Sequence, residues 1–311
     1  LVMHRESLYI FILKVPNYPR ETSYNEIDFC SKYSHRCLTR FYGIVNAYDS
    51  LYGFIYEFMS NGNLNDLILQ NINPISQTYS FLTMNRIYQG INYLHCNSFV
   101  HLKLNPTAIL IDHDFLPYIS DIDSIKMIDG GISIDDSFQN RTYEELLYIS
   151  PEQYEKKYIT FSSNIYSFGR IIYLLFEKNN FFDYDSMESF PVMFHQNDPI
   201  VNSSQKIQML YQLCIKYENE ERIKETDIKN ILYEEANSLY YLENNNLTSD
   251  EIPIHEIIQF IYEMIHLNPV ISPIITDFLF KKYSSLIQKA FQINFTNNYQ
   301  STYKISNNEE F

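Results

Sequence analysis

The stretch VHLKLNPTAILID, residues 100–112, decides how this sequence is interpreted. It follows a segment that ends in YLH at residues 93–95, and SDID follows it at residues 120–123. Its polar residues are a histidine, a lysine, an asparagine, a threonine and an aspartate, which stand among apolar residues and one proline. What such a loop does depends on the elements that surround it in the chain.

The residues before position 60 predict a small sheet with one helix. Residues 8–15, LYIFILKV, are dense in aromatic and aliphatic side chains that favour a strand, and residues 38–45 and 51–59 have the same character. Between the first two segments, apolar residues recur at helical spacing from Ser23 onwards, at Ile27, Cys30 and Tyr33. We therefore expect three strands and one helix in this part.

The rest of the chain predicts helices. One of about fifteen residues should end at His95, since apolar residues before it fall on one helical face. Residues 163–177 are apolar nearly all round, which predicts a buried central helix. Further helices are expected at 206–217 and 225–239. From Glu243 we expect a polar linker and then a helical extension within 243–311. The order predicts an α+β fold.

Composition and charge exclude several classes of function. The net charge of −15 over 311 residues argues against nucleic acid or an anionic membrane surface as the main partner. Apolar runs such as IIYLLF, residues 171–176, are too short for membrane insertion, which needs about 20 residues. The four cysteines have no CxxC spacing, which favours a reducing, cytoplasmic location over a zinc site.

Several short motifs occur in a fixed order. They are FILK at 11–14, Glu26, IYEFMSNGNL at 55–64, VHLKLNPTAIL at 100–110, SDID at 120–123, ISPEQY at 149–154, SSNIYSFG at 162–169, and Arg222. Together they resemble the eukaryotic protein-kinase domain over about residues 1–240, closest to its tyrosine-kinase-like branch. The resemblance implies a bilobal fold, with an N-lobe over 1–58 and a C-lobe over 59–242.

The resemblance also implies which site residues are kept. Lys14 matches the strand lysine that contacts nucleotide phosphates, Glu26 the helix glutamate that holds it, and Asp121 a magnesium ligand. ATP, with or without magnesium, is therefore the cofactor to expect. Ile12 and Tyr56 should narrow the nucleotide pocket. All glycines lie at position 43 or later, so the family's Gly-rich loop is missing and we expect an N-lobe truncated at its start.

Residues with structural roles in the family are also present. His101, with Leu104 and Pro106, keeps the architecture of the catalytic loop. Glu152 should form a buried ion pair with Arg222. Asn164 replaces an aspartate that anchors the loop backbone, and its amide oxygen can still accept those hydrogen bonds.

The catalytic positions themselves are substituted. Lys103 stands where the family has the aspartate base, and Leu102 where it has an arginine. Asn105 replaces a lysine that stabilises the transferred phosphoryl group, and Ala108 replaces an asparagine that binds magnesium. Asp123 stands at the glycine of the family's DFG motif. No catalytic set is therefore intact.

Three interpretations remain open at this point. The favoured one is a catalytically impaired pseudokinase, a regulatory or scaffolding module in signalling whose partner is another kinase or a scaffold. The alternative is an active ATP-dependent Ser/Thr protein kinase with atypical catalytic residues, in which Asp121 or a neighbouring carboxylate compensates. The third is an inert product of gene decay, which the retained Glu152, Arg222 and Pro106 argue against.

Two local features are also open. Lys14 and Glu26 could form a nucleotide site or only a salt bridge. Asp112, Asp121 and Asp123 could bind a cation, although solvated carboxylates are the favoured interpretation for Asp112 and Asp123. Ser124, Ser133 and Ser137 are candidate phosphorylation sites in a segment that we expect to be an ordinary loop.

Overall fold

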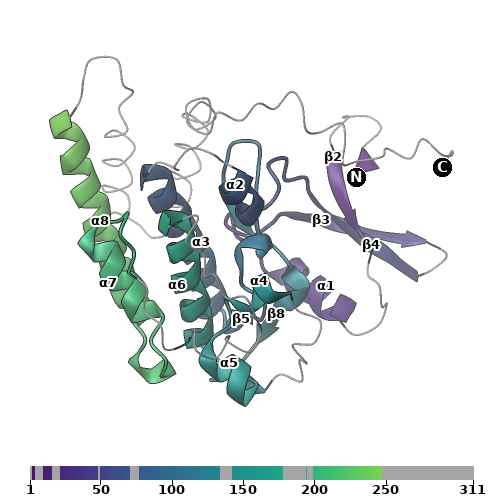
Figure 1. Cartoon of the computed structure of the whole chain (residues 1–311). Helices are drawn as coiled ribbons and strands as arrows, with labels where there is room; N and C mark the ends of the chain where they lie inside the picture. Colours follow the sequence, from purple (N-terminus) through teal and green to yellow (C-terminus); the bar gives the residue numbers. More distant parts are fainter. Residues whose placement is uncertain are drawn as a thin grey trace.

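The computed structural model describes residues 2–3, 10–15, 22–47, 50–70, 77–133, 142–177, 194 and 199–246. The helices expected beyond residue 250, and Ser137 in the candidate phosphorylation segment, lie outside these residues. Within them, no helix has both the length and the apolar character needed to cross a membrane. The predicted α+β class is confirmed, with a small strand-rich part followed by a larger helical part (Figure 1).

The strand-rich part is a four-stranded antiparallel sheet in the order β1-β2-β4-β3. Its strands are β1 (Val2–Met3), β2 (Ile10–Lys14), β3 (Phe41–Ala47) and β4 (Ser50–Glu57), and α1 (Thr22–Lys32) lies beside it. In the central pair, Lys14 is opposite Phe54 and Ile12 is opposite Tyr56. A Cβ atom at Gly53 would lie 2.7 Å from the Lys14 carbonyl oxygen, so a glycine allows β4 to approach β2 at the point where Lys14 is placed.

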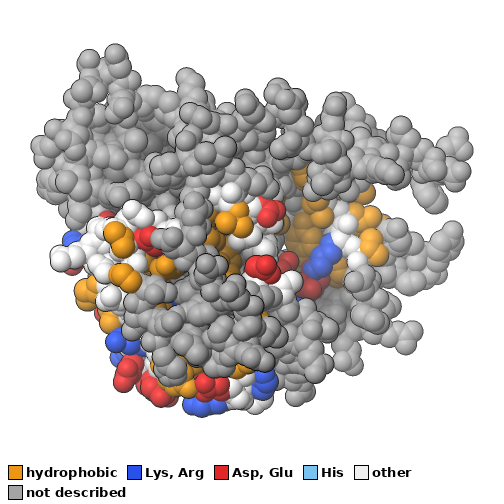
Figure 2. Space-filling view, viewed as in Figure 1, with side chains coloured by type: hydrophobic (Ala, Val, Ile, Leu, Met, Phe, Trp, Pro, Cys, Tyr) orange, Lys and Arg blue, Asp and Glu red, His pale blue; other side chains and the backbone are white. Residues whose placement is uncertain are grey.

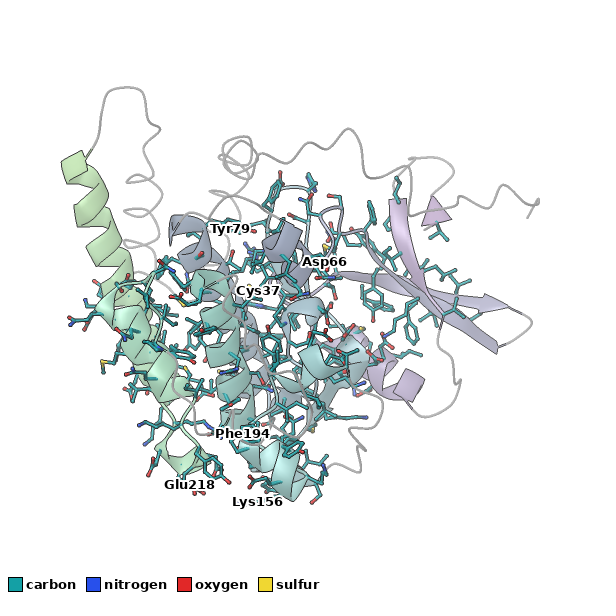
Figure 3. All side chains as sticks on the ribbon, viewed as in Figure 1. Cys37, Asp66, Tyr79, Lys156, Phe194 and Glu218 are labelled. Atoms are coloured by element: carbon teal, nitrogen blue, oxygen red, sulfur yellow. The ribbon has the colours of Figure 1, made fainter. Side chains whose placement is uncertain are left out.

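The helical part is built around α6, whose buried residues cover nearly its whole circumference. Its helices are α2 (Leu64–Gln70), α3 (Gln77–Cys96), α4 (Tyr143–Leu146), α5 (Pro151–Lys156), α6 (Phe161–Glu177), α7 (Gln205–Cys214) and α8 (Glu225–Asn246). The predicted central helix is thus confirmed. Phe194, labelled in Figure 3, packs its ring against Tyr154 and Tyr166 at centroid distances of 5.7 and 6.3 Å.

Three helix boundaries differ by three residues or more from the sequence-based expectation, and the smallest shift is at α7, which ends at Cys214 and not at residue 217. α3 begins at Gln77 and is a 20-residue helix, longer than the expected fifteen. α8 continues to Asn246, so the polar linker expected from Glu243 was placed too early. The asparagines there stay helical as the end of a long helix, because propensity is a weak determinant compared with the continuation of an existing helix.

Short two-stranded sheets hold the stretch 100–112 in place. β5 (Phe99–His101) pairs with β8 (Ile125–Met127), and β6 (Ile109–Ile111) pairs with β7 (Pro117–Ile119). The 3-10 helices η1 (Pro106–Ala108) and η2 (Ile122–Ser124) complete the loops, and β9 (Ile132–Ser133) pairs with β10 (Tyr158–Ile159). The pairs β5–β8 and β6–β7 fix the two ends of the stretch 100–112.

His35, which follows α1, should make folding stability depend on pH. Its ring stacks on Tyr93 at a centroid distance of 4.4 Å, and its Nδ1 accepts the Cys37 N–H at 3.3 Å. Burial, and then the positive charges of Arg86 and Arg36, lower the pKa of His35 to about 4, so the folded protein keeps it neutral.

Because the unfolded chain protonates this histidine below its ordinary pKa of about 6.5, stability should fall as the pH drops from 6.5 towards 4. We expect His35→Gln to reduce the loss of unfolding free energy between pH 7.5 and pH 4.5 by about 1–2 kcal/mol, because water partly screens this half-buried site. Urea unfolding at the two pH values measures the difference. His113→Gln is the control, since this side chain is 74% exposed. Equal pH profiles for native protein and His35→Gln would contradict the assignment.

Candidate functional site

Lys14 pairs with two carboxylates, one on α1 beside the sheet and one in the helical part. Its Nζ lies 3.1 Å from Glu26 Oε1 on α1 and 2.9 Å from Asp123 Oδ1 on η2. Burial lowers the pKa of Lys14, but the charges of Asp123 and Glu26 and their hydrogen bonds outweigh it, so its pKa is raised and the ammonium stays charged. Figure 2 shows basic and acidic side chains next to each other in a hollow beside the apolar surface of the sheet.

Tyr56 and Cys30 complete the surroundings of Glu26. The Tyr56 hydroxyl donates a hydrogen bond to Glu26 Oε1 at 2.5 Å, and the Cys30 Sγ lies 3.7 Å from the same hydroxyl. Burial raises the pKa of Cys30 to about 11, so its thiol is neutral. From the sequence, Tyr56 is expected only to narrow the nucleotide pocket. No sequence pattern indicates this hydrogen bond, because it joins residues that lie 30 positions apart.

Asp121 and Asp123 have different surroundings. Asp121 is exposed, adopts a left-handed backbone with φ of 51°, and precedes η2 without capping it through its side chain. Asp123 pairs with Lys14, so the expectation that it is a solvated carboxylate was wrong. The physical reason is that the turn of η2 and its contact with α1 bring the residue to the lysine.

Among the residues that the structure describes, Asp112 does not form a cluster of possible cation ligands with Asp121 and Asp123. It is 5% exposed, and its Oδ1 accepts the N–H groups of Asp114 and Leu116 at 2.9 and 2.8 Å. Its Oδ2 accepts the Tyr118 hydroxyl at 3.1 Å. Asp112 is therefore a buried turn residue, and the solvated interpretation was wrong for it too. The titratable side chains near its carboxylate are those of His113 and Asp114, which follow it in the chain.

His101 is buried at the start of the loop at 100–112. Asn164 holds its backbone from α6, because Oδ1 accepts the His101 N–H at 2.8 Å and Nδ2 donates to the His101 carbonyl at 2.7 Å. The His101 Nε2 lies 2.9 Å from the Ser120 carbonyl, and its Nδ1 accepts the Lys103 N–H at 3.3 Å. Burial lowers the pKa of His101 more than its surroundings raise it, so the ring is a neutral structural group.

Asn105 has become a capping residue. Its Oδ1 accepts the N–H groups of Thr107 and Ala108 at 2.8 and 3.2 Å and the Thr107 hydroxyl at 2.6 Å. Its Nδ2 donates to the Lys103 carbonyl at 3.2 Å, and the residue is only 4% exposed. The side chain is thus engaged in holding η1. In the sequence this position stands out only by its missing lysine, although Asn before Pro is an N-cap signal.

Two of the other substituted positions, Ala108 and Leu102, are part of the packing. Ala108 is fully buried, and its carbonyl accepts both the N–H and the hydroxyl of Ser120. Leu102 packs against a small apolar cluster that includes Ile159, while its carbonyl accepts the Gln153 amide at 3.0 Å. Lys103, by contrast, is exposed. None of the four residues that replace the family's arginine, aspartate, lysine and asparagine in this loop carries a carboxylate.

The structure brings Glu152 and Arg222 together as a bidentate pair. Arg222 Nη1 and Nη2 donate to Glu152 Oε1 and Oε2 at 2.7 and 2.6 Å, and Ser163 Oγ donates to Oε1 at 2.6 Å. Burial would raise the pKa of Glu152, but the hydrogen bonds and charge of Arg222 outweigh it and lower this pKa. The remaining N–H groups of Arg222 bond to carbonyls, including Lys216 at 2.8 Å.

A long-range contact between His95 and Glu225 was not anticipated. His95 Nδ1 lies 2.6 Å from Glu225 Oε1, and its Nε2 lies 3.3 Å from Asn164 Oδ1. The hydrogen bond from His95 lowers the pKa of Glu225, although burial opposes it. The partners are 130 residues apart, so no local pattern could have joined them. This contact links the first turn of α8 to the residue that holds the loop.

Comparisons with known proteins agree on the nature of this chain. A family model described as "Protein kinase domain" matches residues 2–283. The chain is 28% identical over 174 residues to the G-type lectin S-receptor-like serine/threonine-protein kinase LECRK4 of Oryza sativa subsp. indica, covering 53% of this chain and 20% of that protein. It is 30% identical over 168 residues to the PR5-like receptor kinase of Arabidopsis thaliana, covering 52% and 25%.

A third relative gives a similar match. The cysteine-rich receptor-like protein kinase 6 of Oryza sativa subsp. japonica is 30% identical over 169 residues, covering 52% of this chain and 24% of that protein. The chain spans a quarter or less of the length of these three relatives. The similarity therefore concerns one part of each of them.

Proposed function

This chain belongs to the protein kinase domain family, and from this premise we propose that it is a catalytically impaired member, a pseudokinase that regulates or scaffolds other proteins by binding them. In this proposal the N-lobe comprises residues 1–58 and the C-lobe residues 59–242, within the tyrosine-kinase-like branch. The partner is another kinase or a scaffold protein. The four cysteines are all free thiols, which supports a reducing, cytoplasmic location.

The observation that carries this proposal is the state of the loop at 100–112. Its backbone is held in shape by His101 and Asn164, yet the position of the base is the exposed Lys103. A charged ammonium cannot accept the proton of a substrate hydroxyl, and loss of a general base typically lowers the rate by about 10²- to 10⁴-fold. The Asn105 side chain is engaged as a cap, and the Ala108 methyl group has no polar atom that could bind a phosphoryl group or a second magnesium.

The second candidate is an active Ser/Thr protein kinase with atypical residues. It is favoured by the closed ion pair between Lys14 and Glu26 and by the exposed Asp121. These residues fit ATP with one magnesium, since an ammonium suits phosphate oxygens and a carboxylate suits magnesium. The names of relatives such as LECRK4 also include serine/threonine-protein kinase. The substitution at Lys103 argues against this candidate.

Phosphoryl transfer separates the two candidates. We expect the native chain, supplied with ATP, magnesium and a generic protein substrate, to transfer no more radioactive phosphate than its Asp121→Ala variant, because no base is present at position 103. The native chain without ATP and a competent kinase under the same conditions serve as controls. Transfer by the native chain that disappears in Asp121→Ala would refute the pseudokinase and establish the alternative.

A further inference from the structure

Two carboxylates contact the proposed phosphate-binding ammonium, and a third lies in the same turn as one of them. Glu26 is buried and already accepts the Tyr56 hydroxyl, so it is a fixed partner of Lys14. Asp123 approaches Lys14 from η2 at 2.9 Å, and 41% of its side chain is exposed, so it lies on the solvent-facing side of the ammonium. Asp121 precedes the same turn and is also exposed.

We propose that Asp123 is an internal anion that occupies the ammonium of Lys14 and thereby determines the ligand specificity of the pocket, disfavouring ligands that carry phosphates. This inference rests on the proposed function, because it assumes that Lys14 is the vestigial nucleotide contact. A phosphate oxygen that approaches Lys14 either displaces the Asp123 carboxylate or lies beside it, and both are unfavourable because two negative charges then compete for one ammonium. The pocket therefore discriminates against ATP more strongly than against an uncharged nucleoside.

The charge balance supports this direction. One ammonium faces the carboxylates of Glu26 and Asp123, and Asp121 adds a third negative charge in the same turn. Like charges at close range oppose each other even in a partly solvated site. Since Lys14 and Asp123 are both partly exposed, water screens the pair and the effect should be moderate, about tenfold in affinity.

The backbone holds Asp123 in this place. Its turn is closed by the Ser124 N–H, which donates to the Asp121 carbonyl at 2.8 Å. The Ser124 carbonyl in turn accepts the Leu102 N–H at 2.8 Å, which ties the turn to the loop at 100–112. α1, which carries Glu26, packs on η2. The carboxylate is thus presented to Lys14 by a fixed element, and a glycine at 123 would have no group to present.

The test is ATP binding without magnesium, measured by calorimetry on the full chain. We expect Asp123→Asn to bind ATP about tenfold more tightly than the native chain, and adenosine with unchanged affinity. Asp129→Asn is the matched control, since it removes the same charge from an exposed residue between β8 and β9. In a Lys14→Met background, Asp123→Asn should change ATP affinity by less than about twofold, because the ammonium that it competes for is absent.

Several results would overturn the inference. They are an equal gain in Asp129→Asn, an equal gain in the Lys14→Met background, an equal gain for adenosine, weaker ATP binding in Asp123→Asn, and no ATP binding by either the native chain or Asp123→Asn. Phosphoryl transfer by the same preparations keeps the two proposals apart. Transfer by the native chain would refute the pseudokinase without changing the expected affinity ratio, whereas equal ATP affinities would refute the role of Asp123 without restoring a catalytic base.

Discussion

Glu152→Gln is expected to lower the free energy of unfolding by about 3–5 kcal/mol. The reason is that Arg222 would remain charged and buried without its counter-ion, since its side chain is 0% exposed and Glu152 accepts from both of its terminal nitrogens. Glutamine can accept one of these hydrogen bonds, but it carries no charge. Urea denaturation at neutral pH measures the loss.

Glu155→Gln is the matched control for this prediction. Glu155 lies on the same helix, α5, but it is exposed, and both of its carboxylate oxygens accept the hydroxyl of the half-buried Tyr217 at 2.8 Å. We expect it to cost less than about 1 kcal/mol. The double variant Glu152→Gln with Arg222→Met should recover part of the loss, because no buried charge is then unpaired. Equal losses for Glu152→Gln and Glu155→Gln would contradict the role of the pair.

Asn164→Ala is expected to lower the free energy of unfolding by about 2–4 kcal/mol. The change leaves the buried N–H and carbonyl of His101 without their partners, and each unsatisfied buried group typically costs about 1–3 kcal/mol. The contact of Asn164 with His95 is lost as well. Hydrogen exchange at the His101 amide should accelerate together with the loss of stability measured in urea.

Two further variants test whether the amide geometry causes this effect. Asn164→Asp keeps an acceptor for the His101 N–H and for His95, so we expect a smaller loss than with alanine. Asn97→Ala removes an amide that donates to the Tyr93 carbonyl at the end of α3, and it should cost less than about 1 kcal/mol. If Asn164→Ala leaves exchange at His101 unchanged, the amide does not hold the loop.

The sequence predicted the elements whose signal is local. The apolar character of α6 follows from residues that are adjacent in the chain, and so does the strand that carries Lys14. Motif order, through the resemblance to kinases, also anticipated the contact between Lys14 and Glu26 and that between Glu152 and Arg222. Helix ends were less predictable, because the end of α8 depends on tertiary context as well as on propensity.

By itself, the sequence determined the α+β class and the loss of a carboxylate at position 103, because both are properties of residue type and order. Only the tertiary structure decided that Asp123 neutralises Lys14, that Tyr56 bonds to Glu26, and that His95 pairs with Glu225. The physical reason is that an ion pair or a hydrogen bond between distant residues depends on a few ångströms of packing between elements. Composition and periodicity do not contain those distances.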